Sequence, residues 1–309
     1  MAKDEVGTGA GRQGRGVEVR DVVAAQLPGY GVDSVVLLGE GEDNIAFSVN
    51  GELIVRFGKE PDPESRAARV RGEARLLAAV AGVSPVAVPE PSFTVAERGC
   101  LAYFRLPGLP LIDADPTRRS AQVGSVAVAL GEFLGALHAV PSGEMAGLVG
   151  TDDEPMSVWA EESAQIYGTI SEAVPPPHRP AVEAFLGAAP PADPRDLVFS
   201  HNDLGIEHVL VDPDAWTVTG VIDWSDAAIT DPARDFGLLF RDLGPDALDL
   251  ALSAYQADVE DVRVRAGFYA RCSVLEDMAY GLGTGHRKYL DKSLAALEWL
   301  FPVDVGGGC

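Results

Sequence analysis

Two short apolar segments predict a β-hairpin that brings polar side chains from separate positions together. The segments run from His208 to Val211 and from Thr217 to Ile222, and Asp212-Pro213-Asp214 between them is typical of a turn. Because the open ends of a hairpin are adjacent, His208 at its start and Asp223 after its end become neighbours. Asp203 lies five residues before His208 and can point into the same space. The sequence therefore predicts one site built from Asp203, His208 and Asp223.

These residue types suit phosphoryl transfer from a nucleotide. In kinase chemistry a loop acid orients the acceptor hydroxyl, while an acid and a second ligand hold Mg²⁺ on the nucleotide phosphates. We therefore predict that Asp203 is the catalytic group and that His208 and Asp223 are the metal ligands. Hard cations prefer oxygen, so His208 binds Mg²⁺ through one imidazole nitrogen or through a bound water molecule.

The length of 309 residues allows two lobes with a cleft between them. The Gly-rich residues 1–18 predict a disordered tail. We expect residues 19–106 to form a lobe that binds the nucleotide and ends in a hinge. Residues 107–309 are expected to form a second lobe for catalysis and acceptor binding. The boundary is placed at Pro107-Gly108-Leu109-Pro110, which interrupts the pattern on both sides.

Periodicity predicts an α+β fold with a small antiparallel sheet followed by a larger, mainly helical lobe. Asn50-Gly51 between two apolar runs is a strong hairpin signal. The expected strands cover residues 34–38, 45–49, 53–57, 93–95 and 100–104. The expected helices cover residues 63–81, 123–139, 158–173, 179–187, 244–257, 262–282 and 286–300.

The formal net charge of −23 is the strongest signal in the composition. It argues against a nucleic-acid partner, because a polyanion would be repelled, and it favours a cationic small molecule. Solubility alone is the plainer explanation of the same charge. No apolar run approaching about 18 residues is visible, so we expect no membrane partner. Three widely spaced cysteines fit a reducing, cytoplasmic setting, and of the oligomeric states we expect a monomer.

The motif His201-Asn202-Asp203, followed by His208 and later by Ile222-Asp223-Trp224, resembles the aminoglycoside and macrolide phosphotransferases. These enzymes share a protein-kinase-like fold, and their usual pattern is His-Gly-Asp, four residues, Asn, and later Ile-Asp-Trp or Ile-Asp-Phe. Here Asn202 replaces the glycine and His208 replaces the asparagine. Both replacements are similar to those of the aminoglycoside 2″-phosphotransferases, and the second also to the macrolide 2′-phosphotransferases.

The resemblance implies further roles across the chain. Gly39 and Gly41 fall in the nucleotide loop, and Arg56 takes the place of the lysine that contacts the phosphates, with Lys59 as a nearby alternative. Glu73 matches the helix residue that holds this cation, although Arg56 and Glu73 could also be plain surface charges. The hinge that receives the base contains Tyr103 and Phe104, and Asp235 would brace the catalytic loop through His201.

The sequence gives less information about the acceptor than about the other parts of the proposed reaction. Glu276 and Asp277 are the predicted contacts for a cationic drug, and a solvated acidic helix face is the alternative. The expected activity is transfer of a phosphoryl group from ATP or GTP to an aminoglycoside hydroxyl. A macrolide, a small metabolite alcohol such as choline, homoserine or a sugar, and a non-catalytic pseudokinase remain open. His138, His178 and His286 have no partners at ligand spacing and are expected to be ordinary residues.

Overall fold

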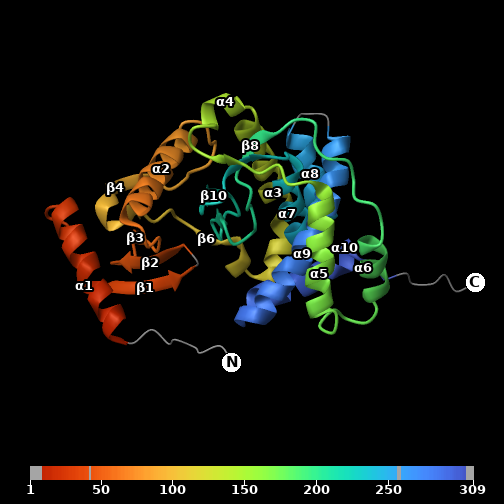
Figure 1. Ribbon diagram of the computed structural model, residues 1–309, viewed down its shortest axis with the longest axis horizontal. Helices are drawn as coiled ribbons and strands as arrows, with labels where there is room; N and C mark the ends of the chain where they lie inside the picture. The colour runs from red at the N-terminus through yellow and green to blue at the C-terminus, as the bar shows by residue number, and fades with distance from the viewer. Residues whose placement is uncertain (1–8, 42, 256–258, 304–309) are drawn as a thin grey trace, which may run out of the picture. The chain divides into compact units, whose positions relative to one another are not determined.

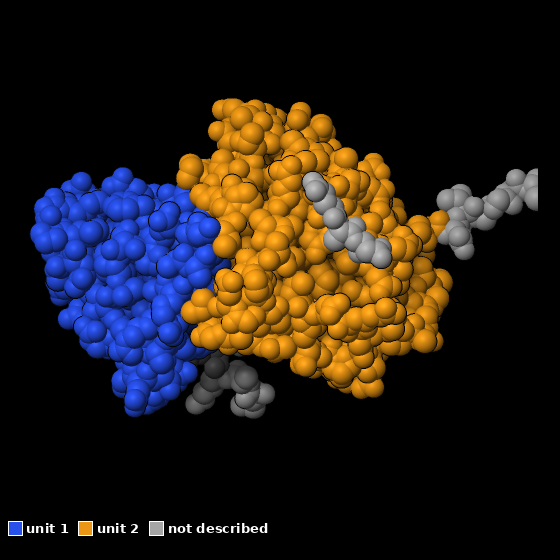
Figure 2. Space-filling view, turned by 90° about the horizontal axis from the view of Figure 1, so that it is seen from above, with its two compact units in different colours: residues 1–82, 88–106 blue, residues 83–87, 107–309 orange. Residues whose placement is uncertain are grey.

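The computed structural model describes residues 9–41, 43–255 and 259–303. The chain divides into two compact units, residues 1–82 with 88–106 and residues 83–87 with 107–309 (Figure 2). The elements of unit 1 are α1 (Gly9–Gln26), β1 (Val35–Glu40), β2 (Asn44–Val49), β3 (Leu53–Gly58), α2 (Pro63–Ala81), β4 (Pro91–Val95), the 3₁₀ turn η1 (Ala96–Arg98) and β5 (Cys100–Phe104).

The sheet of unit 1 has the order β1-β2-β3-β5-β4, and all of its pairs are antiparallel. Asn50 and Gly51 turn β2 back onto β3 with φ angles of 54° and 79°, which is the left-handed geometry that tight hairpins need. The Asn50 side chain also accepts hydrogen bonds from the main-chain N–H groups of Asp33 and Ser34. Helix α2 begins at Asp62, whose carboxylate accepts from Ser65 N at 2.8 Å.

Helix α1 corrects the expectation of a disordered tail. Residues 9–18, predicted to be disordered, lie in a helix, while residues 1–8 lie outside the described residues. Glycine-rich segments disfavour an isolated helix, but this helix continues into Val19, Val22 and Val23, which are buried in the core of the sheet with Phe47 and Phe57. Tertiary packing of those valines outweighs the low helix propensity of the glycines.

Unit 2 is mainly helical (Figure 1). Its elements are β6 (Leu109–Pro110), the 3₁₀ turn η2 (Leu111–Asp113), α3 (Pro116–His138), α4 (Ser142–Met145), β7 (Gly150–Thr151), α5 (Met156–Ile170), α6 (Arg179–Leu186), β8 (Val198–Ser200), β9 (Val209–Val211), β10 (Val218–Val221), β11 (Ala228–Thr230), α7 (Ala233–Leu243), α8 (Pro245–Tyr255), α9 (Glu260–Thr284) and α10 (Arg287–Leu300). Helix α9 packs against α5, α7 and α10. The predicted α+β class is confirmed.

Two local predictions for this part of the chain are wrong, and two elements near the site were not predicted. Helix α3 starts seven residues before the expected 123, because Asp115 caps it by accepting from Arg118 N at 2.9 Å. Helix α7 and strand β11 were not predicted at all. Residues 83–87 were assigned to the first lobe but belong to unit 2, where Ala87 O accepts from Val221 N at 3.0 Å.

Helix α3 is longer and more apolar than the sequence pattern indicated. Among the described residues it is the one helix that is long and apolar enough, by length and composition, to cross a membrane. Small and polar residues separate the larger apolar side chains of this helix, so the sequence shows no long apolar run. Its buried side chains include Val126, Leu130, Phe133 and Leu134, and the helix packs against α8. Helices at the core of a folded domain have the same composition, so the test carries no conclusion about a membrane.

The close packing of α3 and α8 generates a stability prediction. A Cβ atom at Gly131 would lie 2.2 Å from the main-chain oxygen of Ala251, whereas one at Gly124 would meet only the Leu250 Cδ1 atom, at 3.4 Å. We expect Gly131→Ala to lower the free energy of unfolding by about 1–3 kcal/mol, because two backbones must move apart. Gly124→Ala on the same helix should be neutral or stabilise by up to about 1 kcal/mol. Urea unfolding of the two variants measures both effects, and equal stabilities would contradict the prediction.

Candidate functional site

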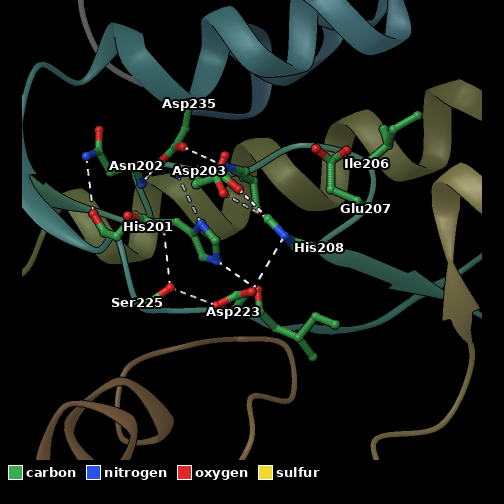
Figure 3. A network of polar contacts seen from close by, with 12 residues as sticks. His201, Asn202, Asp203, Ile206, Glu207, His208, Asp223, Ser225 and Asp235 are labelled. Atoms are coloured by element: carbon green, nitrogen blue, oxygen red, sulfur yellow. Dashed lines mark hydrogen bonds and ion pairs between the residues drawn. The ribbon is translucent and has the colours of Figure 1, made fainter. Parts of the chain in front are cut away.

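The candidate site is built on the loop that joins β8 to β9 and on the end of β10 (Figure 3). Strand β8 ends at Ser200, and the polar loop carrying Asp203 follows directly. Strands β9 and β10 form the predicted antiparallel hairpin, which Ile222 N extends by donating to His208 O at 2.9 Å. Asp223 therefore leaves the hairpin beside His208, as the sequence pattern predicted.

The structure brings Asp203, His208 and Asp223 together. The Nδ1 atom of His208 lies 2.7 Å from the main-chain oxygen of Asp203 and 3.4 Å from its Oδ2. The Nε2 atom of the same ring lies 3.9 Å from Asp223 Oδ2 (Figure 3). The main-chain oxygen of Asp203 can only accept, so Nδ1 carries the proton and Nε2 is the ring atom directed at Asp223.

Two residues of the site have left-handed backbone conformations. Asn202 has a φ of 67° and Asp223 a φ of 63°. Asn and Asp adopt this region more readily than other residues with a side chain, and glycine adopts it freely. Asn202 therefore occupies a position whose backbone suits the glycine of the His-Gly-Asp pattern. Its side-chain Nδ2 donates to Asp152 Oδ2 at 3.0 Å and to Asp226 O at 3.2 Å, which ties the loop to neighbouring chain.

Asp235 braces the loop, but by a different route from the predicted one. Its buried carboxylate accepts from the main-chain N–H groups of Asn202 at 2.9 Å and Leu204 at 3.0 Å, and from the Ser200 hydroxyl. His201 was expected to transmit the brace, yet it makes separate contacts: Nε2 donates to Ile222 O at 3.0 Å, and Nδ1 accepts from Asp203 N at 3.3 Å. Burial is the main reason that the pKa of His201 is lowered, which favours this neutral ring.

A second layer of buried contacts lies behind Asp235 and was missed in the sequence. His138, expected to be ordinary, lies between Ser200 Oγ and the Tyr255 hydroxyl, each 2.8 Å from one of its ring nitrogens. Since Ser200 donates its proton to Asp235, His138 Nε2 donates to Ser200 and Nδ1 accepts from Tyr255. Burial lowers the pKa of His138 to about 4, against a smaller opposing effect of Asp235.

A network of buried ion pairs also supports the loop between β8 and β9. Asp242 Oδ2 accepts from Ile206 N at 3.1 Å, and Arg241 pairs with Asp242 at 2.7 Å and with Asp277 at 3.1 Å. Lys292 lies 2.9 Å from Glu207 and 3.0 Å from Asp277. Asp242 follows Asp235 by two helical turns, a spacing that could have revealed it. Lys292 comes from α10, and no local pattern indicates that it reaches this point.

A pocket of about 520 Å³ within unit 2 is lined by Asp203, His208 and Asp223, and by Glu207, Arg241 and Asp277 of the ion network. The predicted acceptor residues Glu276 and Asp277 both belong to its wall; Glu276 is exposed, whereas Asp277 is largely buried by its ion pairs. Asp226 and Asp152, which the sequence did not single out as site residues, are also there. Most of the lining side chains are acidic or aromatic: Asp152, Asp203, Glu207, Asp223, Asp226, Glu276, Asp277, Tyr280 and Tyr289.

The acidic surroundings shift the titration of the central groups. The pKa of Asp203 is raised, first because the protein removes water from its carboxyl group and also because Glu207 and Asp226 add negative charge, while His208 opposes the shift. Burial by itself lowers the pKa of His208, but Asp203, Glu207 and Asp223 together outweigh burial and raise it. The neighbouring carboxylates therefore favour the positively charged form of His208.

His208 and Asp223 can supply two of the ligands of a Mg²⁺ ion, but not its whole coordination shell. Among the described residues no group of three or more His, Cys, Asp or Glu side chains could hold a metal by itself. Mg²⁺ does not require one, because it is usually held by one or two carboxylates, with water and substrate phosphates completing its shell. Two ligands of one octahedral Mg²⁺ lie about 3.0–4.2 Å apart, and the 3.9 Å between His208 Nε2 and Asp223 Oδ2 falls in that range.

The predicted nucleotide-binding residues belong to unit 1. Arg56 from β3 pairs with Glu73 from α2 at 2.8 Å, and both side chains are largely buried. Gly39 lies in β1 at a register shift, and the main-chain oxygen of Gly41 accepts from Lys59 at 2.8 Å. Tyr103 and Phe104, predicted to belong to the hinge, lie in the expected strand at residues 100–104, β5, whose residues 100–103 pair with both β3 and β4. Tyr103 lies within this strand, whereas Phe104 at its end is 47% exposed.

Comparison with known proteins gives concordant results. A family model described as "Phosphotransferase enzyme family" matches residues 34–269. The viomycin phosphotransferase of Streptomyces vinaceus is 26% identical over 243 residues, which are 76% of this chain and 82% of that protein.

Solved structures share the fold. The GDP and kanamycin complex of APH(2″)-IIIa aligns with a TM-score of 0.66 and 21% identity over 91% of this chain and 97% of that one. The macrolide 2′-phosphotransferase MphH from Brachybacterium faecium aligns with a TM-score of 0.59 and 23% identity over 94% and 99%. Both structures support the kinase-like architecture.

His138 generates a prediction about stability and pH. Its pKa is about 4 in the folded state and 6.5 without the fold, so the unfolded chain binds more protons between these values. Its stabilising contribution is complete above pH 6.5 and is lost as the pH falls toward 4, by roughly 3 kcal/mol. We expect His138→Gln to be less stable at pH 7 and to lose less stability between pH 7 and pH 4 than the wild type does. Unfolding measured across this range tests the prediction, and parallel curves would contradict it.

Proposed function

Because this chain belongs to the phosphotransferase enzyme family, we propose that it transfers the γ-phosphoryl group of ATP or GTP to a hydroxyl of a cationic antibiotic. An aminoglycoside is the first candidate acceptor. The names of the relatives add viomycin and macrolides to the acceptors that must be tested.

One observation carries the proposal: Asp203, His208 and Asp223 meet in the wall of a pocket in which seven of the fifteen lining residues are acidic. A single pocket thus contains an acid able to orient a hydroxyl and further groups able to hold a metal ion. The volume of about 520 Å³ lies within the usual range for small-molecule sites.

In the proposed reaction Asp203 accepts a hydrogen bond from the acceptor hydroxyl, and so orients its oxygen toward the phosphorus atom. Asp223 would hold Mg²⁺ by a carboxylate oxygen, and His208 would offer Nε2 as a weaker second ligand. Bound Mg²⁺ would neutralise charge on the nucleotide phosphates. Asp235 and His201 keep the loop in shape without touching the reacting atoms.

The nucleotide is assigned to the residues of unit 1. Arg56, kept in place by Glu73, would contact the phosphates, with Lys59 as the alternative cation. Gly39 and Gly41 would let the β1–β2 turn approach the phosphates closely. Tyr103 and Phe104 would lie near the base. An arginine in place of lysine keeps the charge and offers a planar fork of donors.

A cationic acceptor is supported by the charge of the pocket. The buried network under the loop contains three acids, Glu207, Asp242 and Asp277, and only two cations, Arg241 and Lys292. An acceptor ammonium group would compensate the remaining negative charge, and the net charge of −23 would attract cations over a longer range.

The test is turnover with ATP and with GTP, each offered with kanamycin, viomycin, a macrolide, choline and homoserine, and followed by mass spectrometry. We expect a gain of about 80 Da, one phosphoryl group, on a cationic antibiotic. Asp203→Asn should lower turnover at least about 100-fold, because the hydroxyl loses its acceptor carboxylate. Nucleotide affinity and the melting temperature serve as controls and should stay unchanged.

Product on choline or homoserine alone would replace the proposal with a metabolite kinase. Nucleotide binding without product on any acceptor would indicate a pseudokinase. Asp203→Asn within about tenfold of the wild type would remove Asp203 from its proposed role.

The acidic wall allows a matched pair of variants on one helix. Glu276 lines the pocket, whereas Glu260 is an exposed acid of α9 that does not. We expect Glu276→Gln to raise the KM of a cationic acceptor about three- to tenfold with little change in kcat, because it removes one attractive charge. Glu260→Gln should leave both constants unchanged. Equal effects of the two substitutions would show that only the overall charge matters.

A further inference from the structure

A second pocket, of about 670 Å³, lies in unit 2 and shares no lining residue with the candidate site. Its wall comes from α6 and the residues before it, from α9, and from the end of α10 with the residues that follow. Arg271 of α9 is its one charged lining residue among the described residues, and the other nine are proline, alanine, phenylalanine, leucine or valine. An apolar pocket with one cation differs sharply from the acidic pocket of the candidate site.

The guanidinium group of Arg271 lies against two aromatic rings of this wall. Its central carbon is 5.8 Å from the centroid of the Phe185 ring and 6.0 Å from that of the Phe301 ring. The two rings meet edge to face, with their centroids 5.7 Å apart. Nε of the same group donates to Leu300 O at 3.0 Å. Because Phe185, Leu300 and Phe301 all line the pocket, these contacts place the guanidinium group at its wall.

The hydrogen bonds of Arg271 leave one nitrogen uncommitted. Nε satisfies the carbonyl at the end of α10, and Nη1 donates to Gly267 O at 3.3 Å, so both have a structural role. Nη2 forms no hydrogen bond with a described residue, and it is not one of the enclosed polar atoms. A ligand in the pocket can therefore receive a hydrogen bond from the guanidinium group without breaking the two that hold it in place.

The charge of Arg271 is also uncompensated. It has no acidic partner within the described part of the chain, whereas Arg263 and Arg265 on the same helix pair with Asp249 and Asp231. Burial lowers the pKa of Arg271, because the charged form has lost part of its water. Since folding has already removed that water, a negatively charged ligand would gain attraction with less additional desolvation.

The rest of the wall decides what kind of anion fits. Apart from Arg271, no described side chain of the wall carries a hydrogen-bonding group, so the several oxygens of a phosphate or sulfate would lack donors. A carboxylate needs fewer donors, and an attached apolar body can cover the rings and prolines. We propose that this pocket binds a small apolar molecule with one carboxylate group, which pairs with Arg271. The site is separate from the proposed phosphotransfer and does not depend on it.

The test is isothermal titration calorimetry on the intact protein with three probes of one shape. 4-Phenylbutyrate carries the carboxylate, 4-phenylbutanamide is neutral, and 4-phenylbutylamine is a cation. We expect the acid to bind with a Kd of about 0.1 mM, as is typical of a ligand of this size, and the other two at least about tenfold more weakly. Arg271→Gln should weaken binding of the acid at least about tenfold, and binding of the amide by no more than about twofold.

Two further variants make the result specific. Arg263→Gln removes the same charge from the same helix outside the pocket and should leave the affinity for the acid unchanged. Ala184→Trp fills the pocket from α6 and should abolish binding of the acid without any change of charge, which keeps the test valid even if Arg271→Gln does not fold. Melting temperatures report folding.

Three outcomes would overturn the inference. They are an acid that binds no more tightly than the amide, equal effects of Arg271→Gln and Arg263→Gln, and no saturable binding of the acid. Self-association of the wild type that is lost in Ala184→Trp would assign the pocket to a second copy of the chain and would also refute it. Phosphorylation of an antibiotic plays no part in these measurements, so failure of the proposed function leaves them unaffected.

Discussion

The buried carboxylate of Asp235 accepts hydrogen bonds from two main-chain N–H groups of the loop and from Ser200, and the geometry of the candidate site depends on these contacts. Each acceptor bond to an ionised carboxylate is charge-assisted and stronger than a neutral one. The loop contains a left-handed residue, Asn202, which a flexible segment would not hold in place. Asp235 and the Ser200–His138–Tyr255 chain behind it keep Asp203 at a defined position.

Charge is arranged in two layers around the pocket. In the buried layer, Arg241 and Lys292 compensate most of the acids and fix the underside of the loop. Toward the pocket, acids such as Asp226 and Glu276 are exposed. Arg234, which also lines the pocket, stands apart, because aromatic rings rather than carboxylates stabilise it. A pocket of this kind discriminates by where charge is left uncompensated, not only by its shape.

Much of the sheet unit and the central hairpin could be predicted because their signals are local. Asn50-Gly51 requires only the left-handed tendency of two residues, and the hairpin from β9 to β10 requires only alternating runs and a turn. Helix α1 was missed because its glycines argue against a helix, and the buried valines that stabilise it find their partners on distant strands. Helix α7 was missed because Asp235 was interpreted only as a residue that braces the loop, and not as part of a periodic pattern.

The candidate site, like the fold, has one part that local sequence signals predict and another part that they do not. The sequence by itself determined that Asp203, His208 and Asp223 converge, because hairpin geometry and a short loop leave them little freedom. Only the tertiary structure decided that Lys292 and His138 support that loop, since each comes from a helix with no sequential tie to it. The physical reason is how far along the chain the interacting residues lie. Turns and strand registers depend on neighbouring residues, whereas burial and ion pairing depend on which distant helices pack together.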